Sequence, residues 1–280
     1  MLAHAFMRHA FLAGTFVALA CGIVGYFVVL RAQVFAGDAL SHVAFTGALA
    51  AAAAGVDTRV GLFAATLAVA GGLGALGDRA RADDVVIGSV FAWILGLGVL
   101  FLSIFASGAG GANGTQGARV LFGTIFGLSA ADARLAAVIA LAVIVAVLAL
   151  ARPLLLTSIA PAVAAAQGVP VRAVGLAFLL AVGAVAGEAT QAVGALLLLG
   201  LLAAPAGAAR LATASPWKGL ALSAAIATGS TWAGLALSYQ IDRLPPSTAI
   251  ILIAAGAYLI ASIVRLREKP LRAINHRGGG

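Results

Sequence analysis

The chain has 280 residues, of which 63% are hydrophobic and only 9% are charged, and its mean hydropathy is +1.12. Soluble domains carry about 25% charged residues and about 45–50% apolar residues, so this composition excludes an ordinary soluble domain. The net charge is +8, but the basic residues lie in short segments between apolar runs and in the tail, which is typical of membrane topology rather than of a nucleic-acid surface. Cys21 is the single cysteine, so neither an internal disulfide nor a cysteine-based metal cluster is expected.

Nine apolar runs approach the roughly 20 residues that a helix needs to cross the hydrocarbon core of a bilayer. They are residues 10–30, 39–56, 60–77, 85–107, 135–151, 173–187, 189–209, 219–241 and 244–264. The sequence therefore predicts an all-α polytopic membrane protein, with a single transmembrane domain of about eight to nine helices over residues 1–280. Glu188 separates two of the runs, which could also form one broken or re-entrant hairpin.

The distribution of lysine and arginine predicts how the spans are oriented. If the basic tail, residues 265–280, lies inside and the spans alternate, 12 of the 17 basic residues fall on inner segments. The five on outer segments are Arg8, Arg59, Arg119, Arg134 and Arg243. We therefore expect the N-terminus outside, the C-terminus in the cytoplasm, and a cytoplasmic loop over residues 152–172.

A short helix is expected inside that loop, over residues 158–171. Pro161 would lie in its first turn and Gly168 near its C-cap. A short helix across the inner face is suited to docking another protein, although an ordinary connector would have the same sequence pattern.

An acid and a histidine interrupt the apolar sequence near residue 40. Asp38 and His42 are four residues apart, so they share one face of a helix, and ionisable residues inside a membrane are costly unless they are paired, hydrated or functional. Carboxylate and imidazole groups suit zinc or manganese, but zinc usually takes about four ligands in a closed site. A second copy of the helix across a two-fold axis would supply the others. Alternatively, Asp38 caps a helix that starts after Gly37, Ser41 completes its first turn, and His42 is a buried core histidine.

Two further residues are candidates for a transport path. Glu188 would lie at the outer mouth, where it could attract cations, or it would be a solvated loop acid or a helix cap. Pro205 removes a backbone hydrogen bond inside a predicted span, and it marks either a hinge that lines the path or a packing kink. The sequence contains no GxxxxGK[ST] phosphate loop, so ATP-driven transport would need a separate ATPase chain.

Four blocks of the sequence resemble the permease subunits of the zinc/manganese-type ATP-binding-cassette importers, the ABC-3 family. The blocks are VLRAQVFAGDALSHVAFTG (29–47), IAPAVAAAQGVPV (159–171), VGALLLLGLLAAPAGAARLAT (193–213) and LSYQIDRLPPSTAIILI (237–253). The first is similar to the family's Asp-x-Leu-x-His block and the second to its docking helix. Ala160 and Ala162 stand where family members often carry acids, and Ser247 stands where glycine is usual.

The resemblance implies a multi-pass permease in the cytoplasmic membrane, belonging to an ATP-driven importer of zinc, manganese or iron. The ion would be cargo, and the chain would hold no cofactor and perform no covalent chemistry. The implied partners are a second permease, identical or paralogous, a cytoplasmic ATPase dimer and an extracytoplasmic metal-binding protein. The resemblance assigns Asp38 and His42 to a transient metal site shared across the dimer. It assigns ATPase docking to Ala160, Pro161, Ala164 and Gly168.

Three other functions stay open at this point. A secondary transporter coupled to ions or protons would use Asp38 as its proton site, and ATP dependence against proton-gradient dependence in vesicles would separate the two. An importer of a chelated metal or cobalamin would differ in its cargo. An intramembrane hydrolase needs a nucleophile and a base on facing helices, whereas Ser41 and His42 are adjacent and do not face each other on a helix.

Overall fold

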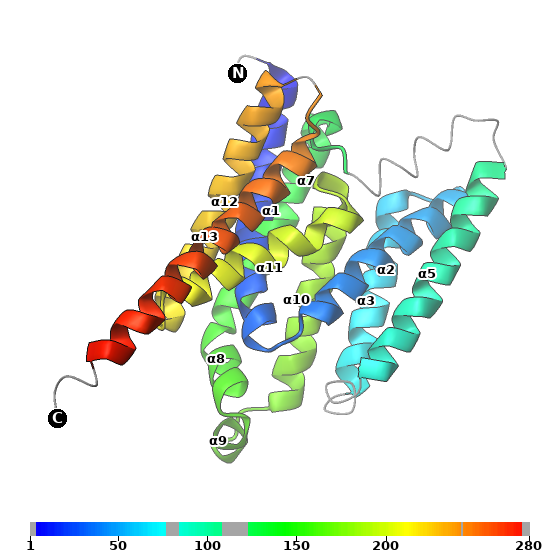
Figure 1. Cartoon of the computed structure of the whole chain (residues 1–280). Helices are drawn as coiled ribbons and strands as arrows, with labels where there is room; N and C mark the ends of the chain where they lie inside the picture. Colours follow the sequence, from blue (N-terminus) through cyan, green and yellow to red (C-terminus); the bar gives the residue numbers. More distant parts are fainter. Residues whose placement is uncertain (1–3, 77–83, 108–122, 242, 276–280) are drawn as a thin grey trace.

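The structure is a computed structural model that describes residues 4–76, 84–107, 123–241 and 243–275, and the described chain is a bundle of helices (Figure 1). The long helices are α1 (Ala5–Leu30), α2 (Val34–Ala53), α3 (Thr58–Leu76), α5 (Asp84–Ser107), α7 (Ala130–Ala149), α10 (Val171–Ala192), α11 (Ala195–Ala212), α12 (Pro216–Gln240) and α13 (Pro246–Asn275). The short ones are η1 (Ile125–Gly127), α8 (Ala151–Ile159) and α9 (Pro161–Ala166).

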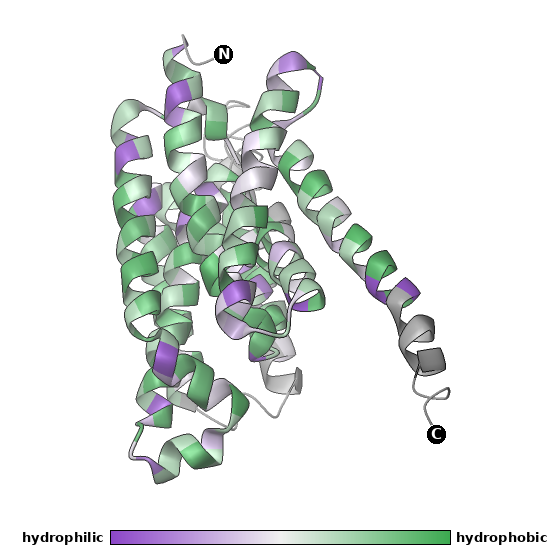
Figure 2. Ribbon diagram, turned by 90° about the vertical axis from the view of Figure 1, so that its left-hand side faces the viewer, coloured by the Kyte–Doolittle hydropathy of each residue, from purple (hydrophilic) through white to green (hydrophobic). Residues whose placement is uncertain are grey.

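Among the described residues, seven helices are long and apolar enough to cross a membrane. Two others, α5 and α11, contribute shorter apolar stretches over residues 88–104 and 198–212. The predicted all-α polytopic fold is confirmed. Most residues along the helices are hydrophobic, and α13 leans away from the bundle toward its C-terminal end (Figure 2).

Helix α1 forms the centre of the bundle. It packs against α7, α10, α11 and α12, and Cys21, Val24 and Phe27 are fully buried. The helix carries no charge between Ala10 and Leu30, and a helix that is apolar on all sides is stable only where other helices or lipid surround it. The α2 helix packs beside this centre on α3, α5, α10 and α11.

Small residues let two of these helix pairs approach closely. A Cβ atom on Gly25 of α1 would overlap the carbonyl oxygen of Leu202 in α11 and lie 2.9 Å from its carbonyl carbon. Between α2 and α3, a Cβ on Gly47 would lie 2.5 Å from the carbonyl oxygen of Gly61. Close backbone approach through small residues is a common way for membrane helices to associate, because lipid provides no hydrophobic drive between them.

The two ends of the bundle are marked by different polar contacts. At one end Arg31, between α1 and α2, donates hydrogen bonds to Thr157 and Ser158 of α8. At the other end Arg59, near the start of α3, reaches the start of α7 and the last turn of α10. Arg31 and α8, which the charge distribution assigns to one side, therefore lie at one end of the bundle. The start of α1 and the last turns of α13 lie at opposite ends (Figure 1).

Two predicted boundaries are wrong. Glu188 does not separate two spans, because it lies inside α10, where Arg59 faces its carboxylate. The break comes instead at Gly194, whose φ of 96° is a conformation that favours glycine. The region predicted as the loop 152–172 contains most of α8 in addition to the predicted short helix α9.

Candidate functional site

Helix α2 carries both residues of the predicted metal pair. The helix begins at Val34 with Gln33 as its N-cap, so Asp38 lies more than one turn inside, and its interpretation as the N-cap is wrong. The Ser41 hydroxyl donates to the backbone carbonyl of Asp38 (2.7 Å) rather than completing a cap. Asp38 and His42 are both half-buried, and their spacing places them on one face of the helix.

Helix α5 packs on this face of α2. The His42 ring meets Phe91 edge to face, with centroids 5.1 Å apart, and Phe91 also contacts Phe35, with centroids 5.7 Å apart. Asp38 lies between Phe35 and His42 on the same helical stripe. Farther along α2, the Thr46 hydroxyl donates to the carbonyl of Ile94 (3.0 Å). The pair therefore lies at the boundary of α2 and α5, and the interpretation of His42 as a buried core histidine is wrong.

One chain offers two ligands at this position. Among the described residues there is no group of three or more His, Cys, Asp or Glu side chains that could hold a metal ion. A carboxylate and an imidazole can both coordinate zinc, and imidazole also suits iron while carboxylate suits manganese. A four-ligand site at Asp38 and His42 would need groups from outside the described part of the chain.

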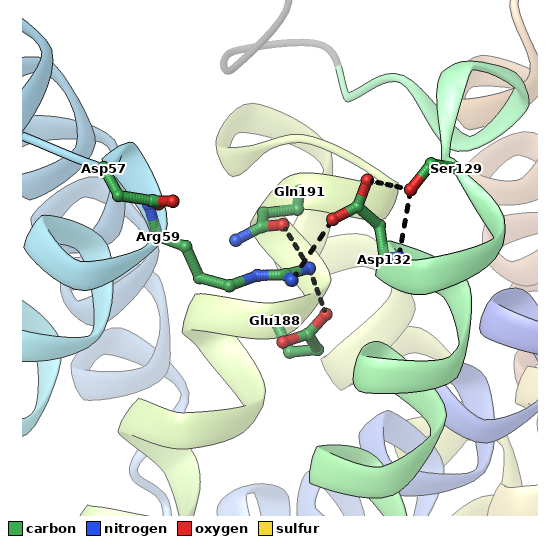
Figure 3. A network of polar contacts seen from close by, with 6 residues as sticks. All are labelled: Asp57, Arg59, Ser129, Asp132, Glu188 and Gln191. Atoms are coloured by element: carbon green, nitrogen blue, oxygen red, sulfur yellow. Dashed lines mark hydrogen bonds and ion pairs between the residues drawn. The ribbon is translucent and has the colours of Figure 1, made fainter.

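A second polar site joins the start of α3, the start of α7 and the last turns of α10 (Figure 3). Arg59 donates through Nη2 to Oε1 of Gln191 (2.9 Å), and the same nitrogen lies 3.6 Å from Oε1 of Glu188. Through Nη1 it donates to Oδ1 of Asp132 (3.4 Å). Asp57 fixes the start of α3, because its carboxylate accepts the backbone N–H of Arg59 (2.7 Å). One guanidinium thus links α3, α7 and α10.

The start of α7 presents Asp132 to this cluster through a helix cap. Ser129 is the N-cap, and its hydroxyl accepts the backbone N–H of Asp132 (3.1 Å) and donates to Oδ2 of the same residue (2.6 Å). A side chain held in this way at a helix N-terminus loses little further freedom when it meets a cation. The cap therefore orients the carboxylate toward Arg59.

Glu188 is the buried acid of the cluster. Its side chain is 3% exposed and that of Asp132 is 47% exposed, so the interpretation of Glu188 as a solvated loop acid or cap is wrong. Its Oε2 atom has no hydrogen-bond partner within the described part of the chain. Sequence reasoning placed Arg59 and Glu188 on the same side of the membrane but did not pair them. The role of Glu188 at an outer mouth stays a prediction, and it requires access that this conformation does not provide.

Removing Arg59 should destabilise the fold because it leaves the Glu188 carboxylate buried without a compensating charge. We expect Arg59→Met to lower the free energy of unfolding by about 2 kcal/mol, whereas the double variant Arg59→Met/Glu188→Met should recover most of that loss. Asp132→Asn should cost less than about 1 kcal/mol, since that carboxylate is half exposed. Denaturant unfolding in detergent measures all three, and an Arg59→Met variant no less stable than Asp132→Asn would contradict the account.

The predicted docking segment forms the expected short helix. Pro161 occupies the first turn of α9, and Gly168 follows the helix with φ of 79°. Pro161 and Gly168 are exposed and Ala160 is half-buried, but Ala164 is fully buried. The Ala164 side chain therefore packs inside the protein and is not accessible to a partner. The docking role of this segment stays a prediction.

Pro205 lies inside α11 and is buried. Proline cannot donate to the carbonyl of Leu201, four residues earlier. The close contact of α1 with α11 occurs one residue later, at Leu202. A hinge at Pro205 would therefore act beside this close contact of α1 with α11, and this role is also a prediction.

These features define a polytopic membrane protein with an ionisable pair inside its helical bundle. The chain belongs to the ABC 3 transport family, whose model matches residues 3–265. It is 29% identical over 262 residues to the manganese transport system membrane protein MntC of Listeria innocua, covering 93% of this chain and 91% of that protein. It is 29% identical over 269 residues to a Haemophilus influenzae protein named "Probable iron transport system membrane protein", covering 94% and 96%.

A solved structure has the same fold. PsaBC from Streptococcus pneumoniae, determined in complex with Fab, superposes with a TM-score of 0.79 at 24% sequence identity, covering 92% of this chain and 91% of that one. The likeness extends over almost the whole bundle. It therefore concerns the arrangement of the helices as a set and not one segment.

Proposed function

We propose that the chain is the membrane permease subunit of an ATP-driven importer of divalent transition metal ions. The observation that carries the proposal is the position of Asp38 and His42 on one face of α2 in a member of the ABC 3 transport family. The relatives named above are manganese and iron transport proteins by name, and zinc accepts the same pair of ligands. A separate ATPase chain hydrolyses ATP, and an extracytoplasmic protein delivers the ion.

The ion passes through a transient site built from two copies of α2. Asp38 and His42 supply one carboxylate and one imidazole, and the same pair from a second permease across a two-fold axis completes four ligands. Transport requires binding that is strong enough for entry and weak enough for release. A site divided between two subunits meets that requirement, since separation of the subunits takes apart the ligand set.

The short helix α9 couples the ATPase to this site. It packs on α8, and α8 holds Arg31 through hydrogen bonds to Thr157 (3.2 Å) and Ser158 (3.3 Å). The guanidinium also lies over the Phe178 ring of α10, 5.4 Å from its centroid. Arg31 directly follows α1 and precedes the start of α2 by three residues. A displacement of α9 therefore reaches the α1–α2 turn, and from there Asp38, through a short chain of contacts.

This coupling fixes the orientation that we propose. The end of the bundle with α9 faces the cytoplasm, as does the C-terminus, and the Arg59 cluster and the N-terminus face outside. The excess of lysine and arginine on the segments at the α9 end supports this orientation. The protein then lies in the cytoplasmic membrane with its ionisable pair between the two faces.

Uptake by reconstituted vesicles tests the proposed function. The vesicles would contain the permease with its ATPase and its binding protein, and zinc, manganese and iron would be supplied one at a time. We expect uptake of at least one of these ions to require ATP and to persist when the proton gradient is dissipated. Uptake that follows the proton gradient and ignores ATP would instead make the protein a secondary transporter.

Arg31→Gln should uncouple ATP hydrolysis from transport. The variant loses charged hydrogen bonds to α8 that are worth about 1.5–3 kcal/mol each, so we expect the number of ions imported per ATP hydrolysed to fall about tenfold. Arg152→Gln, which removes an exposed charge from α8 itself, is the matched control and should keep the ratio. An unchanged ratio in Arg31→Gln would exclude this route of coupling.

A further inference from the structure

A cavity of about 830 Å³ opens at the α9 end of the bundle, away from both polar sites described above. Its walls come from the ends of α1, α8 and α11, the start of α12, and α13. Arg210 and Arg265 line it together with Tyr26, Tyr258 and Thr213, and neither Asp nor Glu is among the described residues of the lining. The described lining is therefore positively charged, and it includes two tyrosines.

The two arginines approach the cavity from different helices. Arg210, in the last turn of α11, is held by one hydrogen bond from Nη1 to the backbone carbonyl of Val29 (3.2 Å). A guanidinium has five N–H donors, so further donors are available to an anion. Arg265 and Tyr258 are seven residues apart on α13, which places them on one face of that helix. Both arginines are exposed, as a site that exchanges its ligand requires.

The rest of the lining is apolar. Val29, Leu30, Ile159 and Leu211 form part of the walls. On α13, Leu259 and Leu266 directly follow the lining residues Tyr258 and Arg265, and both leucines are exposed, so an apolar surface borders the cavity. A free inorganic anion would gain nothing from such surfaces, whereas an amphiphile could bury its chains against them.

We propose that this cavity binds the phosphate headgroup of an anionic membrane phospholipid. Arginine matches phosphate geometry with paired hydrogen bonds, tyrosine is enriched at the level of lipid headgroups, and basic pockets between membrane helices on the cytoplasmic side hold anionic headgroups. The acyl chains would lie along the outward surface of α13. The proposal concerns the lipid alone and does not depend on which ion is transported.

Lipid titration of the purified full-length permease, followed by native mass spectrometry, tests this site. Phosphatidylglycerol and phosphatidylcholine would be compared on the wild type and on Arg210→Gln/Arg265→Gln. The matched control is Arg134→Gln/Arg243→Gln, which removes two exposed arginines at the opposite end of the bundle. We expect the wild type to prefer phosphatidylglycerol. Affinity should fall about fivefold for each cavity arginine removed, about 25-fold for both, and should be unchanged in the control.

Four outcomes would overturn the proposal. An equal loss of phosphatidylglycerol affinity in Arg134→Gln/Arg243→Gln would show that only the overall charge of the protein matters. Equal binding of the two lipids by the wild type would show that the site does not select an anionic headgroup. Saturation by inorganic phosphate at the affinity of the lipid would make this a site for a free anion. In a second measurement, on the permease purified together with its ATPase, loss of the ATPase from Arg210→Gln/Arg265→Gln with phosphatidylglycerol binding retained would make the cavity a protein interface. If the double variant fails to fold, Arg265→Gln alone, which alters an exposed residue, should still bind phosphatidylglycerol about fivefold more weakly.

Discussion

Replacing His42 with alanine or Asp38 with asparagine should reduce ATP-dependent metal uptake at least about a hundredfold. In a homodimer each substitution occurs twice, so His42→Ala removes two of the four proposed ligands and Asp38→Asn replaces two carboxylates with weaker neutral amide ligands. Loss of groups that merely orient a ligand typically costs 10–100-fold in metal affinity or activity, and loss of the ligands themselves should cost at least as much. Both side chains are half-buried at the boundary of α2 and α5, so we expect both variants to fold.

The matched control is Ser41→Ala on the same helix. Ser41 is fully buried, and its hydroxyl contacts the backbone of Asp38 rather than its carboxylate. We expect uptake by this variant to stay within about twofold of the wild type, since a neutral hydrogen bond contributes only about 1 kcal/mol. If Ser41→Ala lost metal uptake and His42→Ala kept it, the functional group on α2 would be the Ser41 hydroxyl and not the His42 imidazole. Normal uptake by both His42→Ala and Asp38→Asn would show that the transport site is not on α2.

Gly25→Ala should destabilise the bundle by at least about 3 kcal/mol. An alanine normally stabilises a helix by about 1 kcal/mol relative to glycine, but the new Cβ would overlap the carbonyl oxygen of Leu202. The obstacle is backbone rather than a flexible side chain, so α1 and α11 would have to separate. Overpacking a well-packed core typically costs about 1–3 kcal/mol even where side chains can adjust, and here the contact lies at the central helix.

Gly229→Ala is the same substitution at another helix position, and we expect it to change the stability in the opposite direction. A Cβ at Gly229 in α12 would meet no atom within 4 Å, so this variant should be up to about 1 kcal/mol more stable than the wild type. Unfolding of the two variants in one detergent, followed by circular dichroism, compares them directly. A Gly25→Ala variant as stable as Gly229→Ala would show that the contact between α1 and α11 is looser than described.

Composition and the length of the apolar runs were sufficient to predict the fold class. An uncharged run such as residues 10–30 has few stable alternatives to a membrane helix, and α1 covers that range. The boundaries near polar residues were predicted less well. Asp38 suggested a helix start, but α2 begins earlier at Val34, because apolar residues before the acid can also enter the helix. Glu188 suggested a loop, and a pattern local in sequence could not reveal that Arg59, 129 positions earlier, compensates its charge.

The parts of the candidate site were predictable to different degrees. The pairing of Asp38 with His42 follows from a spacing of four residues on one helix. The packing of Phe91 against His42 depends on how α5 lies across α2, and no local pattern specifies that arrangement. The same limit applies to Arg31, whose partners in α8 are more than 120 residues away in the sequence. Contacts of this kind depend on tertiary packing.

Anomalous scattering from crystals of the permease soaked with zinc would test the central claim most directly. We predict a single strong peak on the two-fold axis of a permease dimer, about 2.0–2.2 Å from the Asp38 carboxylate and the His42 imidazole of each copy. The peak should disappear in His42→Ala crystals. A peak held by other residues, with Asp38 and His42 outside coordination distance, would contradict the account.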